Sequence, residues 1–314
     1  MSFLSTAVRG VLEQGRFCAV ATTTPHGPHC TPLVFASSGG RLWLTTSRRS
    51  AKTRAWKTDP SVAGLVRHGG LAVTFTGSVK LYDALDRSTW GDAIAGATSI
   101  ARATAAFSAK NARFFAGYAI DAKQVPFAWT PPGRVFVGID VERVALADDE
   151  GVQEGRGRWR GEAVSHPTFR RTTKTGDPLG GVPAGLRSRL GEEGDGALTL
   201  VGDRGPVVVP VRWRLGEAGL MAALPTQTLA LADAGPDAPA ALMLDRASAW
   251  RARDMVGAMA QGTAQLYVLD ALASGARSAK AIASSIDPNA DALVRLAPSR
   301  VVWWQGWSSG TVVL

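Results

Sequence analysis

Short runs in which apolar and polar residues alternate recur along the first half of the chain, separated by glycine-rich turns. They cover residues 17–22, 30–36, 41–46, 61–67 and 71–81. A period of two predicts half-buried strands, and Gly77, inside the last run, is typical of a β-bulge. Short strands joined by frequent turns predict a β-barrel.

Other segments follow a helical pattern. Residues 4–14 carry apolar side chains on one face, and Gly15 follows as a helix stop. Residues 86–122 are rich in alanine and poor in turn residues, which predicts one or two helices. After a loop at residues 126–132, residues 134–144 alternate again and predict the closing strand of the barrel.

The second half of the chain repeats this organisation. Strand-like runs cover residues 197–201, 207–211, 220–224, 241–244 and 257–269. The spacing of Gly27–Pro32 recurs in Gly205–Pro210, and residues 298–304 match residues 131–136 at the start of the closing strand. An internal repeat indicates a repeated architecture. We therefore expect a mainly β, α+β fold with two tandem barrels that form an intramolecular pseudo-dimer and carry helical insertions.

Residues 148–195 have the composition of a connector. They are rich in glycine, threonine and charged residues and poor in apolar ones, which favours a surface linker. Because the segment is long, part of it is expected to fold over a ligand site as a lid. The predicted domains are therefore residues 1–147 and residues 196–314, with this connector between them.

A polar loop joins the predicted strand at residues 41–46 to a short predicted helix that begins at Ala51. Its hydroxyl groups and cations belong to Thr45, Thr46, Ser47, Arg48, Arg49, Ser50 and Lys52. Unpaired amides at a helix start, together with arginine and lysine side chains, commonly hold phosphate. A solvated basic loop before a surface helix is the alternative. The matching residues 225–230 contain no cation, so we expect one phosphate site.

Several motifs in the first half occur in a fixed order. They are Gly27, Thr31-Pro32, Gly39-Gly40, Leu42 to Thr46, Ser50-Ala51-Lys52 and Asp59-Pro60. This order resembles the FMN-binding split-barrel superfamily, which includes pyridoxamine-phosphate oxidase-like proteins and deazaflavin (F420)-dependent reductases. The resemblance implies two tandem split β-barrels that imitate the usual dimer, with the cofactor between them. It also implies that the polar loop holds the cofactor phosphate and that Thr31, Pro32 and Leu33 present backbone groups to its ring system.

The C-terminal segment contains an aromatic cluster, Trp303, Trp304 and Trp307. Such a cluster suits either core packing or a stacking wall for an aromatic ring. Alternate residues of a strand point to opposite faces, so at most one of Trp303 and Trp304 is expected to face the site. Gly306 shares a face with Trp304 and leaves space beside it, which makes Trp304 the predicted ring contact.

No metal site is predicted. His26, His29, Cys18 and Cys30 lie close together in the sequence, but their spacing matches no standard zinc pattern. Turn histidines and small buried cysteines account for them. A haem ligand among them is the alternative, because some split-barrel relatives bind haem. We find no Ser-His-Asp set and no paired carboxylates, so no catalytic side chain is predicted.

The composition narrows the class of partner. The net charge is +9, but the basic residues are spread along the chain and no nucleic-acid-binding module is present, so nucleic acid is not expected. No apolar run is long enough to cross a bilayer, and the first residues lack a signal-peptide pattern. The two cysteines do not form a disulfide framework. We expect a cytoplasmic protein without membrane association.

These observations predict an FMN-dependent oxidoreductase of the pyridoxamine-phosphate-oxidase-like type that acts on a small organic molecule. The cofactor carries the chemistry, which agrees with the lack of a visible catalytic side chain. A monomeric pseudo-dimer or a homodimer is expected. The alternatives are an F420-dependent reductase, a non-catalytic flavin- or haem-binding protein, and a scaffold whose site has decayed.

Overall fold

The computed structural model describes residues 4–126, 130, 133–159, 163–170, 176–217, 219–245 and 251–314. The first half comprises α1 (Thr6–Gln14), β1 (Phe17–Thr24), β2 (Gly27–Ser38), β3 (Arg41–Ser47), α2 (Ala51–Trp56), β4 (Ser61–His68), β5 (Leu71–Tyr82), α3 (Trp90–Ala95), α4 (Ala97–Lys110), α5 (Ala112–Ile120), β6 (Arg134–Ala147) and β7 (Val152–Arg156). The second half comprises α6 (Ala184–Leu190), β8 (Glu193–Gly202), β9 (Gly205–Gly216), β10 (Gly219–Leu224), α7 (Thr226–Ala230), β11 (Asp237–Asp245), the 3₁₀ turn η5 (Ala252–Asp254), β12 (Val256–Val268), α8 (Ala276–Ile286), β13 (Ala292–Gln305) and β14 (Ser308–Val313).

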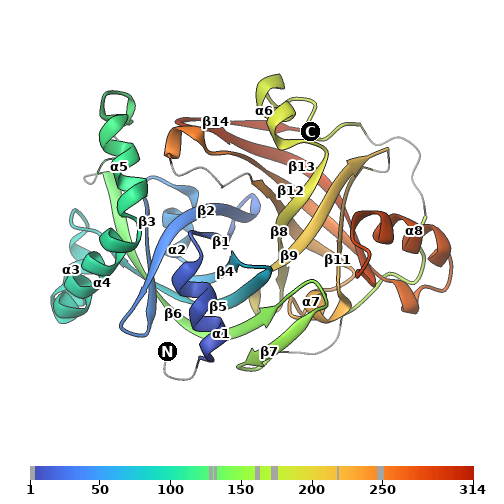
Figure 1. The fold of residues 1–314 in the computed structure, drawn as a ribbon, viewed down its shortest axis with the longest axis horizontal. Helices are drawn as coiled ribbons and strands as arrows, with labels where there is room; N and C mark the ends of the chain where they lie inside the picture. The colour runs from blue at the N-terminus through green and yellow to red at the C-terminus, as the bar shows by residue number, and fades with distance from the viewer. Residues whose placement is uncertain are drawn as a thin grey trace.

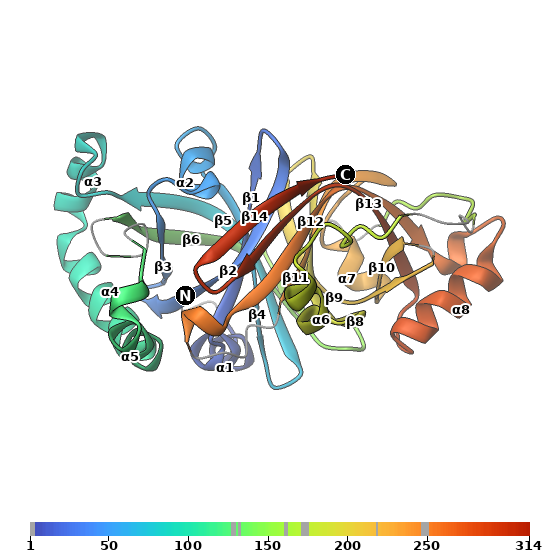
Figure 2. The same ribbon diagram turned by 90° about the horizontal axis from the view of Figure 1, so that it is seen from above.

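The two halves have the same topology. The strand order is β3-β2-β1-β4-β5-β6-β7 in the first sheet and β10-β9-β8-β11-β12-β13-β14 in the second, and the pairings β3–β6 and β10–β13 close each sheet into a barrel. Figures 1 and 2 show the barrels side by side, with α3 to α5 at one end of the molecule and α8 at the other. The predicted fold class is confirmed. That the halves arose by duplication stays a proposal.

The barrels meet through equivalent strands. β9 contacts β4 and β5, and its counterpart β2 contacts β11 and β12. Such reciprocal contacts are those of a twofold dimer. Small side chains dominate the interface, which is formed by Ala19, Ala21, Cys30, Ala63, Leu65 and Ala72 of one barrel against Ala197, Val208, Ala241, Met243 and Met259 of the other. Side chains of this size allow the two sheets to approach closely.

Hydrogen bonds fix the two barrels relative to each other. The Oγ1 of Thr74 on β5 donates to the carbonyl oxygen of Val208 at 2.9 Å. From the second barrel, the Nε2 of Gln261 on β12 donates to the carbonyl oxygen of Pro28 at 2.6 Å. Both bonds are buried, so breaking either would leave a desolvated polar group without a partner.

Each barrel bends a long strand at a glycine. The pairing of β5 with β6 shifts register between Thr76 and Gly77, as the sequence predicted, and the pairing of β12 with β13 shifts between Gln261 and Gly262. A Cβ atom on Gly77 would lie 2.0 Å from the carbonyl oxygen of Asp140. The close approach of two backbones therefore requires glycine here.

The closing strand of the second barrel begins earlier than predicted. Residues 298–304 do not match residues 131–136, because β13 begins at Ala292 and Pro298 lies inside it, opposite Gly262 at the bulge. The hydrogen bonds between the strands are interrupted at a bulge, so a proline, which has no N–H group, is tolerated there. The proline therefore marks a bend of the strand and not its beginning.

The helical insertion also differs from the prediction. Residues 86–122 contain three α-helices, α3, α4 and α5, where one or two were expected. Gly96 ends α3, and Asn111 ends α4 by donating from Nδ2 to the carbonyl oxygens of Phe107 at 2.9 Å and Phe35 at 3.2 Å. An asparagine that bonds to nearby backbone competes with helix propagation.

The predicted connector contains regular structure. β7 pairs with β6 at the edge of the first sheet, and α6 buries Leu186 and Leu190 in the core of the second barrel. Residues 160–162 and 171–175 of the predicted lid, and residues 127–129, 131 and 132 of the predicted loop, lie outside the described residues. We propose that the first domain extends to the end of β7 and that the second domain begins with α6. Among the described helices, none has both the length and the apolar character needed to cross a bilayer.

Replacing Gly77 by alanine tests the bulge. Because the new Cβ would meet the Asp140 carbonyl oxygen, we expect the variant to lose about 1–3 kcal/mol of unfolding free energy, measured by urea denaturation. Gly91→Ala in α3 is the matched control, since a Cβ at Gly91 meets no atom within 4 Å, and it should change stability by less than about 1 kcal/mol. Equal effects of the two substitutions would contradict this description of the bulge.

Candidate functional site

A cavity of about 310 Å³ lies between the two barrels. Its walls come from β1, β2, β3, α2, α5 and β6 of the first half and from η5, β13 and β14 of the second. The predicted site residues that line it are Thr31, Pro32, Leu33, Thr46, Ser47, Ser50, Lys52 and Trp304. We refer to it as the inter-barrel cavity. The second half thus covers the polar loop of the first.

A buried lysine forms part of the polar end of the inter-barrel cavity. Ser50 caps α2 by accepting from the Thr53 backbone N–H at 3.1 Å, and the Oγ1 of Thr53 donates to the Ser47 carbonyl oxygen at 2.8 Å. These bonds fix the start of α2, where Lys52 is 3% exposed and donates from Nζ to Thr31 Oγ1. Among the described residues, Lys52 makes no ion pair.

The environment of Lys52 disfavours its charged form. Burial, reinforced by Arg134, lowers the pKa of Lys52 to about 8, although the neighbouring Cys30 and Cys18 oppose this shift. The ammonium form therefore still predominates at pH 7. A buried charge without a counter-ion is costly, so this end of the cavity is suited to an anion.

Arg134 is a cavity residue that the sequence reasoning missed. It begins β6 opposite Ser47 of β3, and it donates from Nε to Thr45 Oγ1 at 3.0 Å and from Nη2 to the Thr45 carbonyl oxygen at 2.7 Å. Burial lowers the pKa of Arg134, but a guanidinium group stays charged in proteins. The barrel closure that places it beside the loop could be predicted only from the register of two distant strands.

The other predicted loop residues lie outside the cavity lining. Arg48 forms a bidentate contact with Asp83, with Nε 2.7 Å from Oδ2 and 3.0 Å from Oδ1. Arg49 is exposed, and Thr45 holds Arg134 as described above. Asp83 follows β5 and is brought beside Arg48 only by the fold, so the sequence of the loop could not predict this ion pair.

The backbone of β2 is open beside the cavity. β2 pairs with β3 from Phe35 to Ser38, whereas it pairs with β1 from Gly27 to Val34. Thr31, Pro32 and Leu33 therefore lie in the part of β2 that has separated from β3. This separation is the split in the barrel, and it exposes one backbone edge of these residues to the inter-barrel cavity.

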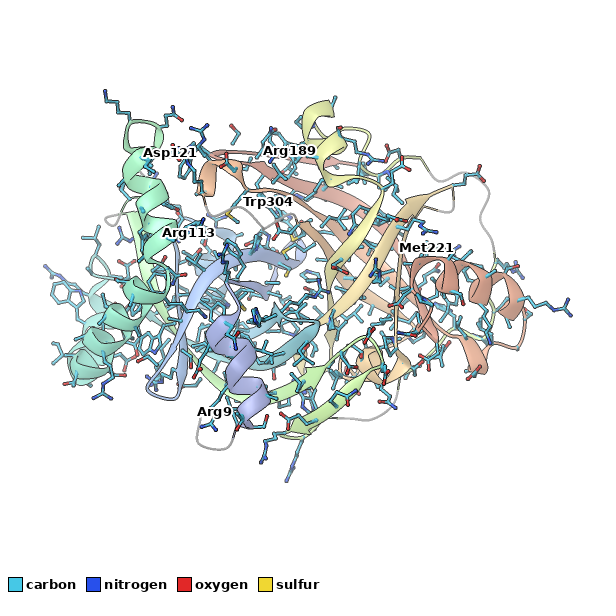
Figure 3. All side chains as sticks on the ribbon, viewed as in Figure 1. Arg9, Arg113, Asp121, Arg189, Met221 and Trp304 are labelled. Atoms are coloured by element: carbon cyan, nitrogen blue, oxygen red, sulfur yellow. The ribbon has the colours of Figure 1, made fainter. Side chains whose placement is uncertain are left out.

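Aromatic side chains form the other end of the cavity. Trp303, Trp304 and Trp307 line it together with Phe114 and Tyr118 of α5, and the rings of Tyr118 and Trp307 meet edge to face at 5.4 Å. Figure 3 shows Trp304 between the two barrels. Its Nε1 is buried over Gly257 of β12 and has no hydrogen-bond partner among the described residues.

The expectation that at most one of the adjacent tryptophans would face the site is wrong, because both line the cavity. Trp304 packs in the interface between the barrels, whereas Trp303 packs against the core of the second barrel, so they do point to opposite faces. The Trp304 ring lies over Gly257 of β12, and the Trp303 ring lies over Gly310 of β14. The cavity extends around the end of β13 and therefore contacts both rings.

An ion pair holds α5 over the cavity. Asp121, at the end of α5, is 5% exposed and pairs with Arg251 and with Arg253 of η5, the latter at 3.3 Å. Figure 3 labels Asp121 at the tip of this helix. The contact joins an insertion of the first barrel to the second barrel, and it positions Phe114 and Tyr118 as a wall.

The histidines and cysteines do not form a metal site. His29 lines the cavity, and burial together with Lys52 lowers the pKa of His29 to about 3, so it is neutral at pH 7. His26 is exposed on its turn, and Cys18 and Cys30 are buried free thiols. Within the described part of the chain, no group of three or more metal-ligating side chains is present.

The second half has an equivalent cavity with different chemistry. Its volume is about 460 Å³, and its lining includes Pro210, Val211, Ala223, Leu224, Pro225, Asp148 and Asp149. The N-cap of α7 is Pro225, which places Gln227 where α2 has Lys52. The cavity is lined by Arg67 and Arg212, but by no cation from its own polar loop.

One protein family matches the first half of the chain. A family model described as pyridoxamine 5'-phosphate oxidase matches residues 4–147. A FAD-binding protein from Mesorhizobium loti is 21% identical over 46% of this chain and 94% of its own, with a TM-score of 0.33. A pyridoxamine 5'-phosphate oxidase-related, FMN-binding protein from Nostoc punctiforme is 18% identical over 49% of this chain and 90% of its own, with a TM-score of 0.33.

An F420 reductase is 17% identical over 46% of this chain and 98% of its own, with a TM-score of 0.30. No curated protein matches the chain. The family match over residues 4–147 coincides with the barrel closed by β3 and β6. The first barrel of the chain, residues 4–147, is therefore similar to the pyridoxamine 5'-phosphate oxidase family.

Proposed function

We propose that the chain binds FMN in the inter-barrel cavity and acts as an oxidoreductase on a small organic molecule. The observation that carries this proposal is the combination of a buried cation and a group of aromatic rings at opposite ends of one cavity. Lys52 is a buried cation without a counter-ion at the polar end, and Trp303, Trp304 and Tyr118 line the aromatic end. A molecule with a phosphate and an aromatic ring system satisfies both.

The polar end fits the phosphate. Lys52 supplies a point charge and Arg134 a second cation, while the hydroxyl groups of Thr46, Ser47 and Ser50 line the same cavity. Charge-assisted hydrogen bonds to phosphate oxygens are stronger than neutral ones, and the anion would compensate the desolvation of Lys52. Arg48 and Arg49 belong to this proposal as positive charges outside the cavity that attract an anion over a longer range.

The aromatic end fits the ring system. Trp303, Trp304 and Tyr118 offer ring faces and edges for stacking. The split between β2 and β3 leaves backbone groups of Thr31 to Leu33 available to polar atoms at the ring edge, as the resemblance implies.

The roles of protein and cofactor are then distinct. Bound FMN supplies hydride or two-electron transfer. The chain anchors the phosphate through Lys52 and Arg134, orients the ring between β2 and β13, and excludes water through α5 and the Asp121 ion pair. With this division, the proposal requires no nucleophile–base pair among the residues that line the cavity.

The absorbance spectrum of the purified protein distinguishes the candidate cofactors. We expect bands at about 375 and 450 nm from FMN, which remain in solution when the protein is removed after denaturation. A single band at about 420 nm would instead identify the bound cofactor as the deazaflavin F420. A sharp Soret band would instead indicate haem, with His29 as the cavity residue able to ligate iron. A protein that remains colourless after incubation with FMN would contradict the proposal.

Lys52→Met tests the phosphate end. Loss of a charge-assisted hydrogen bond should weaken FMN binding by about 1.5–3 kcal/mol, measured as the dissociation constant in a fluorescence titration. Gln227→Met, the equivalent position on α7, is the matched control and should leave the dissociation constant unchanged. Equal losses in the two variants would show that the loop has been assigned incorrectly or that both halves bind.

The low pKa of Lys52 predicts how FMN affinity depends on pH. An anion favours the ammonium form, so affinity should fall as pH rises above about 8, by up to about tenfold per pH unit until the pKa of the complex is reached. The phosphate has lost its second proton well below this range and does not contribute. Lys52→Met should abolish this slope, and a slope that persists in the variant would assign it to another group.

The stability of the cofactor-free protein should show the opposite trend. The pKa of Lys52 is about 8 when folded and 10.5 when unfolded, so between these values the unfolded chain binds a proton that the folded chain does not. The free energy of unfolding should therefore rise with pH in this window. Urea unfolding of the wild type and of Lys52→Met at pH 7.5 and 9.5 measures the difference, and an equal pH dependence in both proteins would contradict this assignment.

A further inference from the structure

A third cavity adjoins the inter-barrel cavity at the barrel interface. Its volume is about 370 Å³, and it shares Phe17 and Pro32 with the inter-barrel cavity. Its floor is apolar, formed by Phe17, Ala19, Pro32, Leu65 and Met243. We refer to it as the central pocket, because both barrels contribute equivalent strands to it. β1 and β4 come from one barrel, and β8 and β11 come from the other.

The equivalent strands contribute opposite charges to the central pocket. On β4, Arg67 lies one residue beyond Val66, which pairs with Cys18 of β1. On β11, Asp245 lies one residue beyond Leu244, which pairs with Gly196 of β8. In a dimer of identical chains these positions would carry like charges. The single chain can therefore provide an asymmetric, polar environment on one side of an apolar floor.

The cations of the central pocket lack carboxylate partners. Arg67 is half-buried, and its hydrogen bonds to described residues both come from Nη2, which donates to the carbonyl oxygens of Gly196 and Val211. Neither Arg67 nor Arg16 forms an ion pair with a described residue. Burial lowers the pKa of Arg67, although Asp195 acts in the opposite direction. Nε and Nη1 of Arg67 thus remain available to an anion.

The carboxylates of the central pocket already have other interactions. Asp195 lies 4.0 Å from Arg212, and both side chains are exposed. Asp245 takes part in an interaction of its own, but its buried Oδ1 accepts no hydrogen bond from a described residue. The pocket therefore places two guanidinium groups that form no ion pair with a described residue beside two carboxylates, above an apolar floor. Its guanidinium groups and floor suit a ligand that has an anionic group and an apolar body.

We propose that the central pocket is the substrate site and that it takes an organic carboxylate, with Arg67 and Arg16 at the carboxylate and Phe17, Leu65 and Met243 against the apolar body. The proposal rests on the proposed function, because this pocket shares Phe17 and Pro32 with the cavity assigned to FMN. It makes Arg67 a specificity-determining residue. A substrate of this class would lie beside the cofactor without occupying the phosphate end of its cavity.

Benzoate and its uncharged amide, benzamide, are suitable probes. With FMN at saturating concentration, calorimetry and saturation-transfer NMR should show benzoate binding at least about tenfold more tightly than benzamide, as expected for a ligand held by a charge-assisted hydrogen bond. Arg67→Gln should remove this preference while leaving the FMN dissociation constant unchanged. Arg214→Gln, at a half-buried arginine outside the central pocket that pairs with Glu193, is the control and should bind both probes as the wild type does.

Three outcomes would overturn the proposal. These are equal affinities for benzoate and benzamide, an unchanged benzoate affinity in Arg67→Gln, and displacement of benzoate by FMN, which would place the carboxylate in the inter-barrel cavity. If Arg67→Gln unfolds, Arg67→Lys keeps a charge and should retain part of the preference for benzoate. Failure of the proposed function is distinguishable, because benzoate binding that depends on Arg67 can be measured by NMR in cofactor-free protein even if FMN does not bind.

Discussion

The close approach of the two barrels is the constraint on which the rest of the structure depends. Alanine side chains of β1 and β4 face alanines of β8 and β11, and buried hydrogen bonds from Thr74 and Gln261 fix the barrels in position. Ala19, Leu65, Ala197 and Met243 of this interface also line the central pocket. The packing of the interface therefore determines the shape of that pocket.

Joining both barrels in one chain allows equivalent positions to differ. α2 places Lys52 in a cavity, whereas α7 has Gln227 at the equivalent position. Arg67 of β4 corresponds to Asp245 of β11. In a symmetric dimer each substitution would appear twice, and the charge on one side of the interface would be the charge on the other. Here one cavity can specialise in an anionic, aromatic ligand while the others change independently, at no cost to the shared interface.

Local patterns in the sequence predicted the strands, the bulge at Gly77 and the polar loop, because alternation and glycine act over a few residues. They could not predict features set by distant partners. Arg48 looked equivalent to Lys52, but Asp83 binds it outside the cavity. Arg134 gave no signal, since its place follows from the closure of the barrel. Pro298 suggested a strand start because a proline at a bulge cannot be distinguished locally from one at a turn.

Titrating the cofactor-free protein with FMN while following tryptophan fluorescence is the most direct test of the central claim. One FMN per chain should bind, and its binding should quench the emission of the tryptophans around the inter-barrel cavity, with a smaller change in Trp304→Leu. Binding of two FMN molecules per chain would contradict a single site between Lys52 and Trp304. An equal change in tryptophan fluorescence in the wild type and in Trp304→Leu would also contradict it.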